Sequence, residues 1–120
     1  MPSVLIVDDD SDICFLERMV LRSADGRFTV VGEAASGDDA IRCWRELRPN
    51  IIVLDDHLPD MRGLDVARLI LGEEPGQVIV LVTADYDDAA ASAASLLGVR
   101  AYLPKTELRR LLAQVLGYPR

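Results

Sequence analysis

Ile51-Ile52-Val53-Leu54-Asp55-Asp56-His57-Leu58-Pro59-Asp60-Met61-Arg62-Gly63 is the stretch that decides the fold of this chain. Its first four residues are apolar and mostly β-branched, which is typical of a strand buried on both faces. The strand ends in two carboxylates, and a Pro and a Gly shape the loop that follows. Open α/β sheets place their ligand chemistry at the carboxyl ends of their strands, and the two carboxylates stand at such an end.

The same pattern recurs along the whole chain, because short apolar runs alternate with segments of helical spacing. The runs predict strands at 3–7, 28–33, 51–54, 78–82 and 101–103. Helices are predicted at 11–23, from Ser36 to a stop at Pro49, and at 64–71, 87–97 and 107–116. In the first helix, the apolar residues at three- and four-residue spacing predict the buried face: Ile13, Leu16, Met19 and Val20.

Strands that are continuous apolar runs indicate a parallel sheet covered on both faces. Right-handed crossovers then favour a doubly wound α/β fold, with five parallel strands in the flavodoxin-like order 2-1-3-4-5 and helices on both faces. The length of 120 residues is that of one domain. We therefore expect a single domain over 1–120, with a core at 3–116 and a tail or truncated linker at 117–120.

Composition narrows the function classes. The net charge is −7, and no cluster of Lys and Arg is present, so this domain itself is not expected to contact nucleic acid. The apolar runs are too short to span a membrane, and the N-terminus carries no signal-type segment, so we expect a cytoplasmic protein without membrane contact. Cys14 and Cys43 match neither zinc nor redox spacing and are expected to act as small apolar side chains.

Polar residues follow four of the five predicted strands. Asp8 and Asp9 follow the first strand, Asp55 the third, Thr83 the fourth and Lys105, the only lysine, the fifth. Parallel strands end at the same edge of a sheet, so these side chains are expected to gather there. Three neighbouring carboxylates repel one another and favour a cation, and oxygen ligands of this kind suit Mg²⁺. A metal, a lysine and a hydroxyl together suit phosphoryl transfer to a carboxylate.

Simpler interpretations exist for each of these residues. The acidic run Asp8-Asp9-Asp10 could be only a helix N-cap with its first-turn charges. Thr83 could cap a turn, and Lys105 could be a solvated charge. His57 has no second His or Cys to share a metal, so a backbone carbonyl is the expected contribution of that residue, with the imidazole in solvent. The joint placement of the group on four strand ends favours the functional interpretation.

Taken together, these residues resemble the receiver domain of two-component response regulators. Four segments carry the resemblance, which covers nearly the whole chain: Val4-Leu5-Ile6-Val7-Asp8-Asp9-Asp10, then Leu54-Asp55 with Pro59 and Gly63, then Val82-Thr83-Ala84, and Tyr102-Leu103-Pro104-Lys105. Single segments are weak signals, but four in this order and spacing are specific.

The resemblance implies a role for each matching residue. Asp55 is similar to the phospho-accepting aspartate, and the adjacent Asp matches a variable position. Asp8 and Asp9 match the acidic pair that binds Mg²⁺ together with Asp55 and the backbone carbonyl of His57. Lys105 matches the lysine that pairs with the phosphoryl group. Such a domain catalyses only its own phosphorylation and dephosphorylation, and is not otherwise an enzyme.

The resemblance also implies a switch, a partner and an output. Thr83 matches the hydroxyl that turns toward the phosphoryl group, and Tyr102 the aromatic residue that changes position with it. A sensor histidine kinase would supply the phosphoryl group. The readout would be a conformational change, with a homodimer through the face of the fourth helix, fifth strand and fifth helix. The segment Val30-Val31-Gly32-Glu33-Ala34 resembles regulators of transcription with a C-terminal helix-turn-helix DNA-binding domain, which would follow this chain unless the protein is a single-domain relay.

Three residues depart from the family pattern. Asn50 stands where an Asp is frequent, and Arg62 replaces a common acidic or amide residue beside Gly63. Pro104 precedes the lysine, whereas many relatives place a proline after it, so a cis peptide after Lys105 is not expected.

Two alternatives to a phosphorylated receiver domain stay open. The first is a phosphatase of the haloacid-dehalogenase type, which the run Asp8-Asp9-Asp10-Ser11 also resembles, although a second acidic pair should then follow Lys105. The second is an adaptor that is not phosphorylated, for which the cation Arg62 near the site is the main argument.

Overall fold

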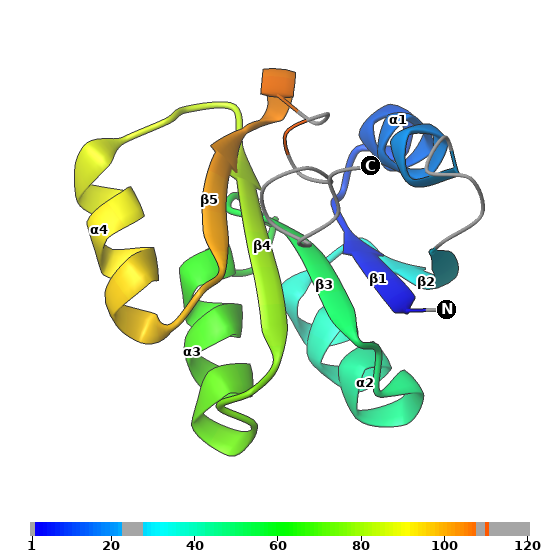
Figure 1. The fold of residues 1–120 in the computed structure, drawn as a ribbon, viewed down its shortest axis with the longest axis horizontal. Coiled ribbons are helices and arrows are strands. Elements are labelled where there is room, and N and C mark those ends of the chain that lie inside the picture. Colours follow the sequence, from blue (N-terminus) through cyan, green and yellow to red (C-terminus); the bar gives the residue numbers. More distant parts are fainter. Residues whose placement is uncertain (1, 23–27, 108–109, 111–120) are drawn as a thin grey trace.

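The structure, a computed structural model, describes residues 2–22, 28–107 and 110. Five strands alternate with four helices and a final 3₁₀ turn (Figure 1). The strands are β1 (Ser3–Val7), β2 (Thr29–Ala34), β3 (Ile51–Asp55), β4 (Val78–Thr83) and β5 (Ala101–Pro104). The helices are α1 (Ser11–Arg22), α2 (Gly37–Leu47), α3 (Gly63–Glu73) and α4 (Asp88–Leu97), followed by the turn η1 (Lys105–Glu107).

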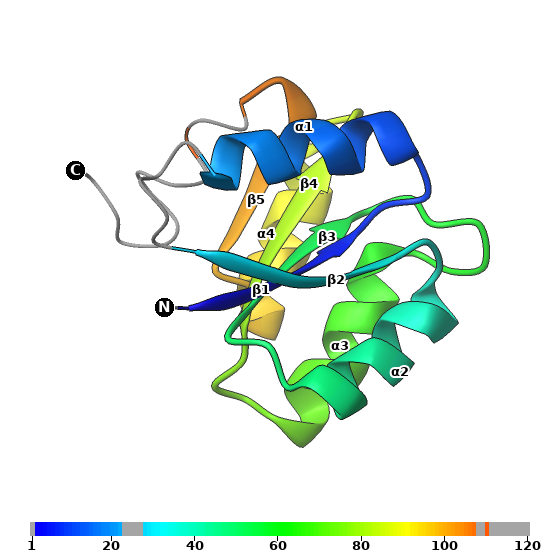
Figure 2. The ribbon, with the colours of Figure 1, turned by 90° about the vertical axis from the view of Figure 1, so that its right-hand side faces the viewer.

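The sheet has the predicted topology. All four strand pairs are parallel, and the order is β2-β1-β3-β4-β5. The helix α1 covers one face of the sheet and α2 and α3 cover the other, as Figure 2 shows. The fold class predicted from the apolar runs is therefore confirmed. The helix predicted at 107–116 falls almost entirely outside the described residues.

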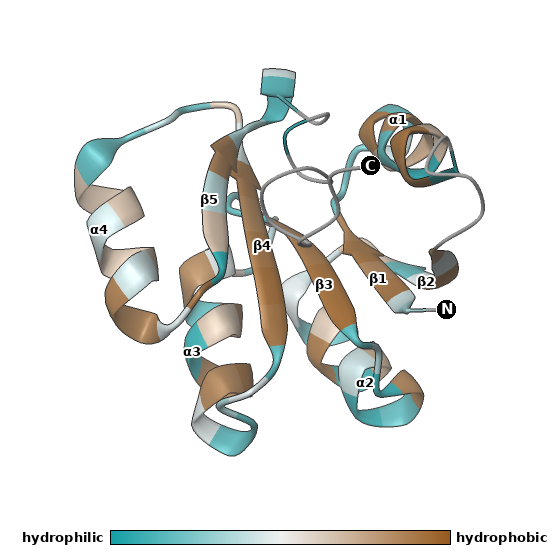
Figure 3. Ribbon diagram, in the orientation of Figure 1, coloured by the Kyte–Doolittle hydropathy of each residue, from teal (hydrophilic) through white to brown (hydrophobic). Residues whose placement is uncertain are grey.

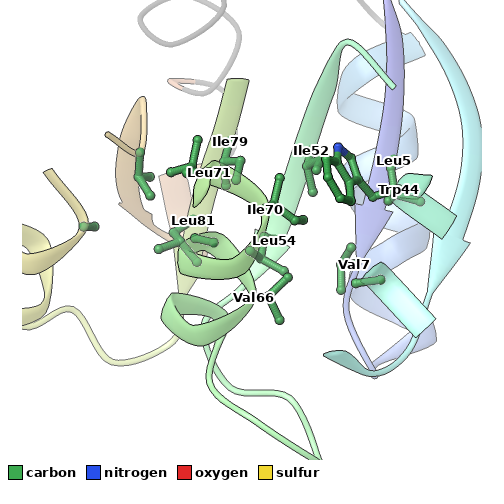
Figure 4. Close-up of a cluster of buried hydrophobic side chains, with 14 of the residues drawn as sticks. Leu5, Val7, Trp44, Ile52, Leu54, Val66, Ile70, Leu71, Ile79 and Leu81 are labelled. Atoms are coloured by element: carbon green, nitrogen blue, oxygen red, sulfur yellow. The ribbon is translucent and has the colours of Figure 1, made fainter. Parts of the chain in front are cut away.

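The three central strands, β1, β3 and β4, bury alternate side chains in two apolar layers, one on each face of the sheet. The layer under α2, α3 and α4 contains Leu54 of β3 and Leu81 of β4, which belong to one cluster with Ile70 and Trp44 (Figure 4). The layer under α1 contains the intervening residues of the same strands, such as Val53. The central strands β3 and β4 are correspondingly hydrophobic along most of their length, whereas β2 and β5 include more hydrophilic segments (Figure 3). Burial on both faces explains why the sequence shows continuous apolar runs rather than alternation.

The buried face of α1 differs from the predicted one. Cys14, Glu17 and Leu21 are buried, whereas Leu16 and Met19 are about half exposed. Helical spacing fits both faces, so spacing alone leaves the rotation of the helix undetermined. The short connection from β1 decides it, since the Asp10 carboxylate caps the Asp12 amide and the Cys14 thiol lies 3.5 Å from the Asp8 carbonyl.

Element boundaries differ from the predicted ones by one or two residues. β2 begins at Thr29 rather than at residue 28, and the ladder with β1 shifts register between Val4 and Leu5. No helix within the described residues is long and apolar enough to cross a membrane.

Candidate functional site

The carboxyl ends of β1 and β3 bring three acidic side chains together. Carboxylate oxygens of Asp8, Asp9 and Asp55 all lie within 4.8 Å of one another. Asp8 and Asp55 are buried, while Asp9 is exposed. This grouping follows from the topology, because β1 and β3 are hydrogen-bonded neighbours in the sheet. Three oxygen donors at this separation fit a hard divalent cation such as Mg²⁺.

Lys105 reaches this cluster from the end of β5. Its ammonium lies 2.9 Å from Asp8 Oδ2 and 3.3 Å from Asp55 Oδ2, and its side chain is 18% exposed. Burial alone would lower the pKa of Lys105, but the hydrogen bond to Asp8 and the charge of Asp55 outweigh burial and raise it. The lysine is therefore held as a cation between two carboxylates. It completes the site from β5, although it is distant in sequence from both carboxylates.

The ionisation of Asp55 is balanced between opposing effects. Burial raises the pKa of Asp55 above its ordinary value, and the charge of Asp8 acts in the same direction. The backbone amide of His57, which donates to Asp55 Oδ1 at 3.2 Å, and the ammonium of Lys105 both oppose this rise. The His57 side chain is exposed to solvent, as the sequence predicted. A cation close to Asp55 therefore favours the ionised form of this buried carboxyl group.

The adjacent Asp56 has a different environment. Its carboxylate is almost completely buried, and Oδ2 lies 2.8 Å from Arg62 Nη2 and 3.5 Å from the Tyr102 hydroxyl. Oδ1 has no hydrogen-bond partner among the described residues. Thr83 is fully buried, and its hydroxyl accepts from the Asp85 amide at 3.0 Å. Burial raises the pKa of Tyr102, and the interaction of its phenol with Thr83 opposes this rise.

Strand alternation assigns the polar residues to two faces of the sheet. Val53 belongs to the layer under α1 and Leu54 to the layer under α2–α4, so the next residue, Asp55, continues the α1 face and Asp56 the other. Leu81 and Tyr102 belong to the same layer as Leu54. The cluster of Asp8, Asp55 and Lys105 is thus separated from the cluster around Asp56.

The loop after β3 is held at both ends by hydrogen bonds. Asp60 accepts from the backbone amides of Gly37 and Asp38 at 2.7 and 3.0 Å, and so caps α2. These two amides lower the pKa of Asp60. The Gly63 amide donates to the Asp56 carbonyl at 2.7 Å. A Cβ on Gly63 would overlap the Asp55 carbonyl oxygen, so the close approach of the loop to β3 requires glycine.

Two features were missed in the sequence. Glu17 is 2% exposed, and neither of its carboxyl oxygens has a partner among the described residues. Burial, and to a smaller extent the charge of Asp8, raises the pKa of Glu17 to about 8. Its spacing from Cys14 and Leu21 is helical and could have indicated the buried face. The pairing of Arg62 with Asp56 had no sequence signal, because loop geometry decides which neighbour the guanidinium meets.

Comparisons with known proteins agree with the resemblance seen in the sequence. The profile of the response regulator receiver domain family matches residues 4–116. The chain is 39% identical over 84 residues to the DNA-binding response regulator MtrA of Mycobacterium tuberculosis, which covers 70% of this chain and 35% of that protein. It is 43% identical over 83 residues to protein-glutamate methylesterase/protein-glutamine glutaminase 3 of Hahella chejuensis, which covers 69% of this chain and 23% of that protein.

Solved structures give the same result. The receiver domain of the response regulator NarL from Mycobacterium tuberculosis matches with a TM-score of 0.81 and 27% identity, over 91% of this chain and 90% of that one. The chain spans only about a quarter to a third of the length of the first curated relatives.

Proposed function

The chain belongs to the family of response regulator receiver domains of two-component signal transduction, and from this premise we propose that Asp55 accepts a phosphoryl group from a sensor histidine kinase. The observation that carries the proposal is the position of Asp55 among Asp8, Asp9 and Lys105. Because the chain belongs to the receiver domain family over residues 4–116, we no longer consider the phosphatase alternative.

The donor set fits a magnesium ion. We assign Asp8, Asp9 and Asp55 as its carboxylate ligands, together with the backbone carbonyl of His57. Bound there, the ion would neutralise negative charge on the phosphoryl oxygens. The excess of carboxylates over the single Lys105 ammonium leaves net negative charge at the site, which supports cation binding.

The residues of the chain perform the transfer. An oxygen of the Asp55 carboxylate forms a bond to phosphorus while the bond from phosphorus to the donor nitrogen breaks. Lys105, already 3.3 Å from Asp55, exchanges its carboxylate contact for a phosphoryl oxygen and stabilises the charge that develops there. The His57 amide and Lys105 oppose the rise in the pKa of Asp55 that burial causes, and so favour the ionised carboxylate, which is the form that attacks.

The structural consequence is a switch through Thr83 and Tyr102. Thr83 ends β4 and Tyr102 lies in β5, on the strand next to it. In the proposed sequence of events, the Thr83 hydroxyl turns toward the phosphoryl group and Tyr102 follows. Both side chains are buried, which supports a coupled movement, since one cannot change position without affecting the packing of the other.

The output and assembly are proposed from the relatives. A homodimer through the face of α4, β5 and the C-terminal segment would transmit the switch to a DNA-binding domain, as MtrA is a DNA-binding response regulator. The similarity to protein-glutamate methylesterase/protein-glutamine glutaminase 3 leaves an output other than DNA binding as the second candidate. We place the protein in the cytoplasm, where response regulators typically act.

The position of Arg62 argues against the adaptor alternative. If this cation neutralised Asp55, it would disable the phosphoacceptor. The guanidinium pairs instead with Asp56, and Asp55 keeps Lys105 as its partner. Asp55, the proposed acceptor, is thus paired with Lys105, the lysine that phosphoryl transfer requires.

Intact-mass measurement tests the proposal. The wild-type chain is incubated with Mg²⁺ and acetyl phosphate, and a phosphoryl adduct is expected on it and on Asp56→Asn, but not on Asp55→Asn. The Asp56 variant is the matched control, because it changes the neighbouring carboxylate in the same way. An equal adduct on the Asp55 variant, or none on wild type, would overturn the assignment.

A further inference from the structure

Arg62 and Asp56 form an ion pair that neither the phosphoacceptor nor the metal site requires. Arg62 Nη2 lies 2.8 Å from Asp56 Oδ2, and Nε donates to the Asp56 backbone carbonyl at 3.3 Å. The guanidinium therefore binds both the side chain and the main chain of the same residue. We call the two residues the Asp56–Arg62 pair.

Burial makes the carboxylate dependent on its cation. The Asp56 side chain is 1% exposed, whereas the Arg62 side chain is 51% exposed. A buried carboxylate is unfavourable unless it is paired, and a half-exposed guanidinium can neutralise it while keeping much of its own hydration. The loop geometry supports the pairing, because an isolated β-bridge between His57 and Arg62 turns the chain back toward the end of β3.

The same carboxylate oxygen faces Tyr102. Asp56 Oδ2 is 3.5 Å from the phenolic oxygen, at the long end of hydrogen-bond range. The ring of Tyr86 packs on Tyr102 with centroids 5.2 Å apart. The phenol of Tyr102 thus lies among Asp56, Thr83 and the Tyr86 ring. Of these three, only Asp56 has a carboxylate, and this carboxylate pairs with Arg62.

We propose that the Asp56–Arg62 pair is a positioning unit that holds the phenol of Tyr102 inward. Asp56 supplies the acceptor, and Arg62 keeps that acceptor in place. Loss of Arg62 removes the guanidinium that pairs with this buried carboxylate, so the Asp56 side chain is expected to turn toward water. This movement weakens its contact with Tyr102, and the tyrosine then samples outward positions more often.

The position of Tyr102 can be measured without any phosphodonor. The chain has three tyrosines, so labelling with 3-fluorotyrosine yields few ¹⁹F resonances, which Tyr102→Phe and Tyr86→Phe assign. Arg62→Ala is expected to displace the Tyr102 resonance. Arg45→Ala is the matched control, since Arg45 is an exposed arginine that pairs with Glu73 at 2.9 Å, and it should leave the resonance in place.

A double-mutant comparison separates positioning through Asp56 from a general effect of the loop. In the Asp56→Asn background, Arg62→Ala should displace the Tyr102 resonance by much less than in wild type, because the neutral amide does not need the guanidinium. An equal displacement in both backgrounds, or none in wild type, overturns the proposal. If Asp56→Asn does not fold, Arg62→Lys decides: as a cation it should keep the resonance closer to wild type than Arg62→Ala does.

The consequence for signalling rests on the proposed function and has a separate readout. Arg62→Ala should still acquire the Asp55 adduct from acetyl phosphate, at a rate within about twofold of wild type, because Lys105 and the acidic cluster are unchanged. The phosphodonor-induced change at Tyr102 should be smaller than in wild type. Absence of the adduct in both proteins would refute phosphorylation at Asp55, while leaving the donor-free result on Tyr102 intact.

Discussion

The ammonium of Lys105 lies 2.9 Å from Asp8 Oδ2 and, through its second contact, joins the end of β5 to the acidic cluster at the ends of β1 and β3. The lysine thus occupies part of the negative potential in which a divalent cation would bind. A bound Mg²⁺ would compete with the lysine for the same carboxylates, and under the proposed function a phosphoryl group on Asp55 would give the lysine a new partner.

Lys105→Ala is therefore expected to bind Mg²⁺ at least as tightly as wild type, and up to several-fold more tightly, because a competing positive charge is removed. Phosphorylation by acetyl phosphate should be slowed by 10-fold or more, on the order expected for loss of one charge-stabilising group. Calorimetric titration of Mg²⁺ and intact-mass kinetics provide the two measurements. Asp9→Ala is the control, and a loss of Mg²⁺ affinity in Lys105→Ala equal to that in Asp9→Ala would contradict the expectation.

Glu17 should make the free energy of unfolding depend on pH. Burial raises its pKa from an ordinary value near 4.5 to about 8, so the folded state holds a proton that the unfolded chain releases. The stabilising effect is complete below pH 4.5 and is lost progressively as pH rises to about 8. The upper limit of this loss is roughly 3–5 kcal/mol, at about 1.36 kcal/mol for each pKa unit.

Urea denaturation of wild type, Glu17→Gln and Glu17→Leu at several pH values between 5 and 9 tests this. Both variants should lose the pH dependence in that range. The leucine should add stability at pH 8, because it puts apolar volume in place of a buried carboxyl group that has no hydrogen-bond partner among the described residues. If wild type and Glu17→Gln show parallel profiles, the carboxyl group is not titrating in the folded state.

Gly63→Ala is expected to destabilise the domain by about 1–3 kcal/mol, the range for overpacking. The new Cβ would overlap the Asp55 carbonyl oxygen and lie 2.8 Å from the Asp56 Cα, and backbone atoms cannot move aside cheaply. Gly72→Ala is the matched control in the same helix. Apart from its chain neighbours and the nearby backbone of α3, no atom of the described residues lies within 4 Å of the Gly72 Cβ position, so this substitution should stabilise α3 by about 0.5–1 kcal/mol. Urea midpoints measure both, and equal effects would show that the clash does not occur.

Asp60 links the loop after β3 to α2, and the link should weaken in acid. The Gly37 and Asp38 amides lower the pKa of Asp60, so its contribution is present above the ordinary pKa of 3.8 and is lost as pH falls through the lower folded-state value. Asp60→Ala should lower the melting temperature at pH 7, and Asp60→Asn should lower it less, because the amide oxygen still accepts a bond. Identical melting temperatures for the two variants would show that the acceptor does not stabilise α2.

The fold was predictable because its signals are local and repeated. Apolar runs at five positions predicted the parallel sheet, and the same runs placed Asp8, Asp55 and Thr83 at strand ends. The rotation of α1 was not predictable from spacing, since Leu16 and Met19 fit a helical stripe as well as Cys14 and Leu21 do. The short connection between β1 and α1 decided which of these two faces is buried. Its effect depends on the position of β1 in the folded sheet, which helical spacing does not contain.

The sequence by itself determined which residues reach the carboxyl edge of the sheet. The end of each strand is visible as the end of an apolar run, and parallel strands all end at the same edge. It also distinguished Asp55 from Asp56 through the resemblance to a known family. The tertiary structure alone decided what these residues contact. Period-two alternation turns Asp55 toward Lys105 and Asp56 toward Arg62 and Tyr102, and the partners come from elements far apart in the chain. Pairing of buried charges depends on distances of a few ångströms, which only the packed fold sets.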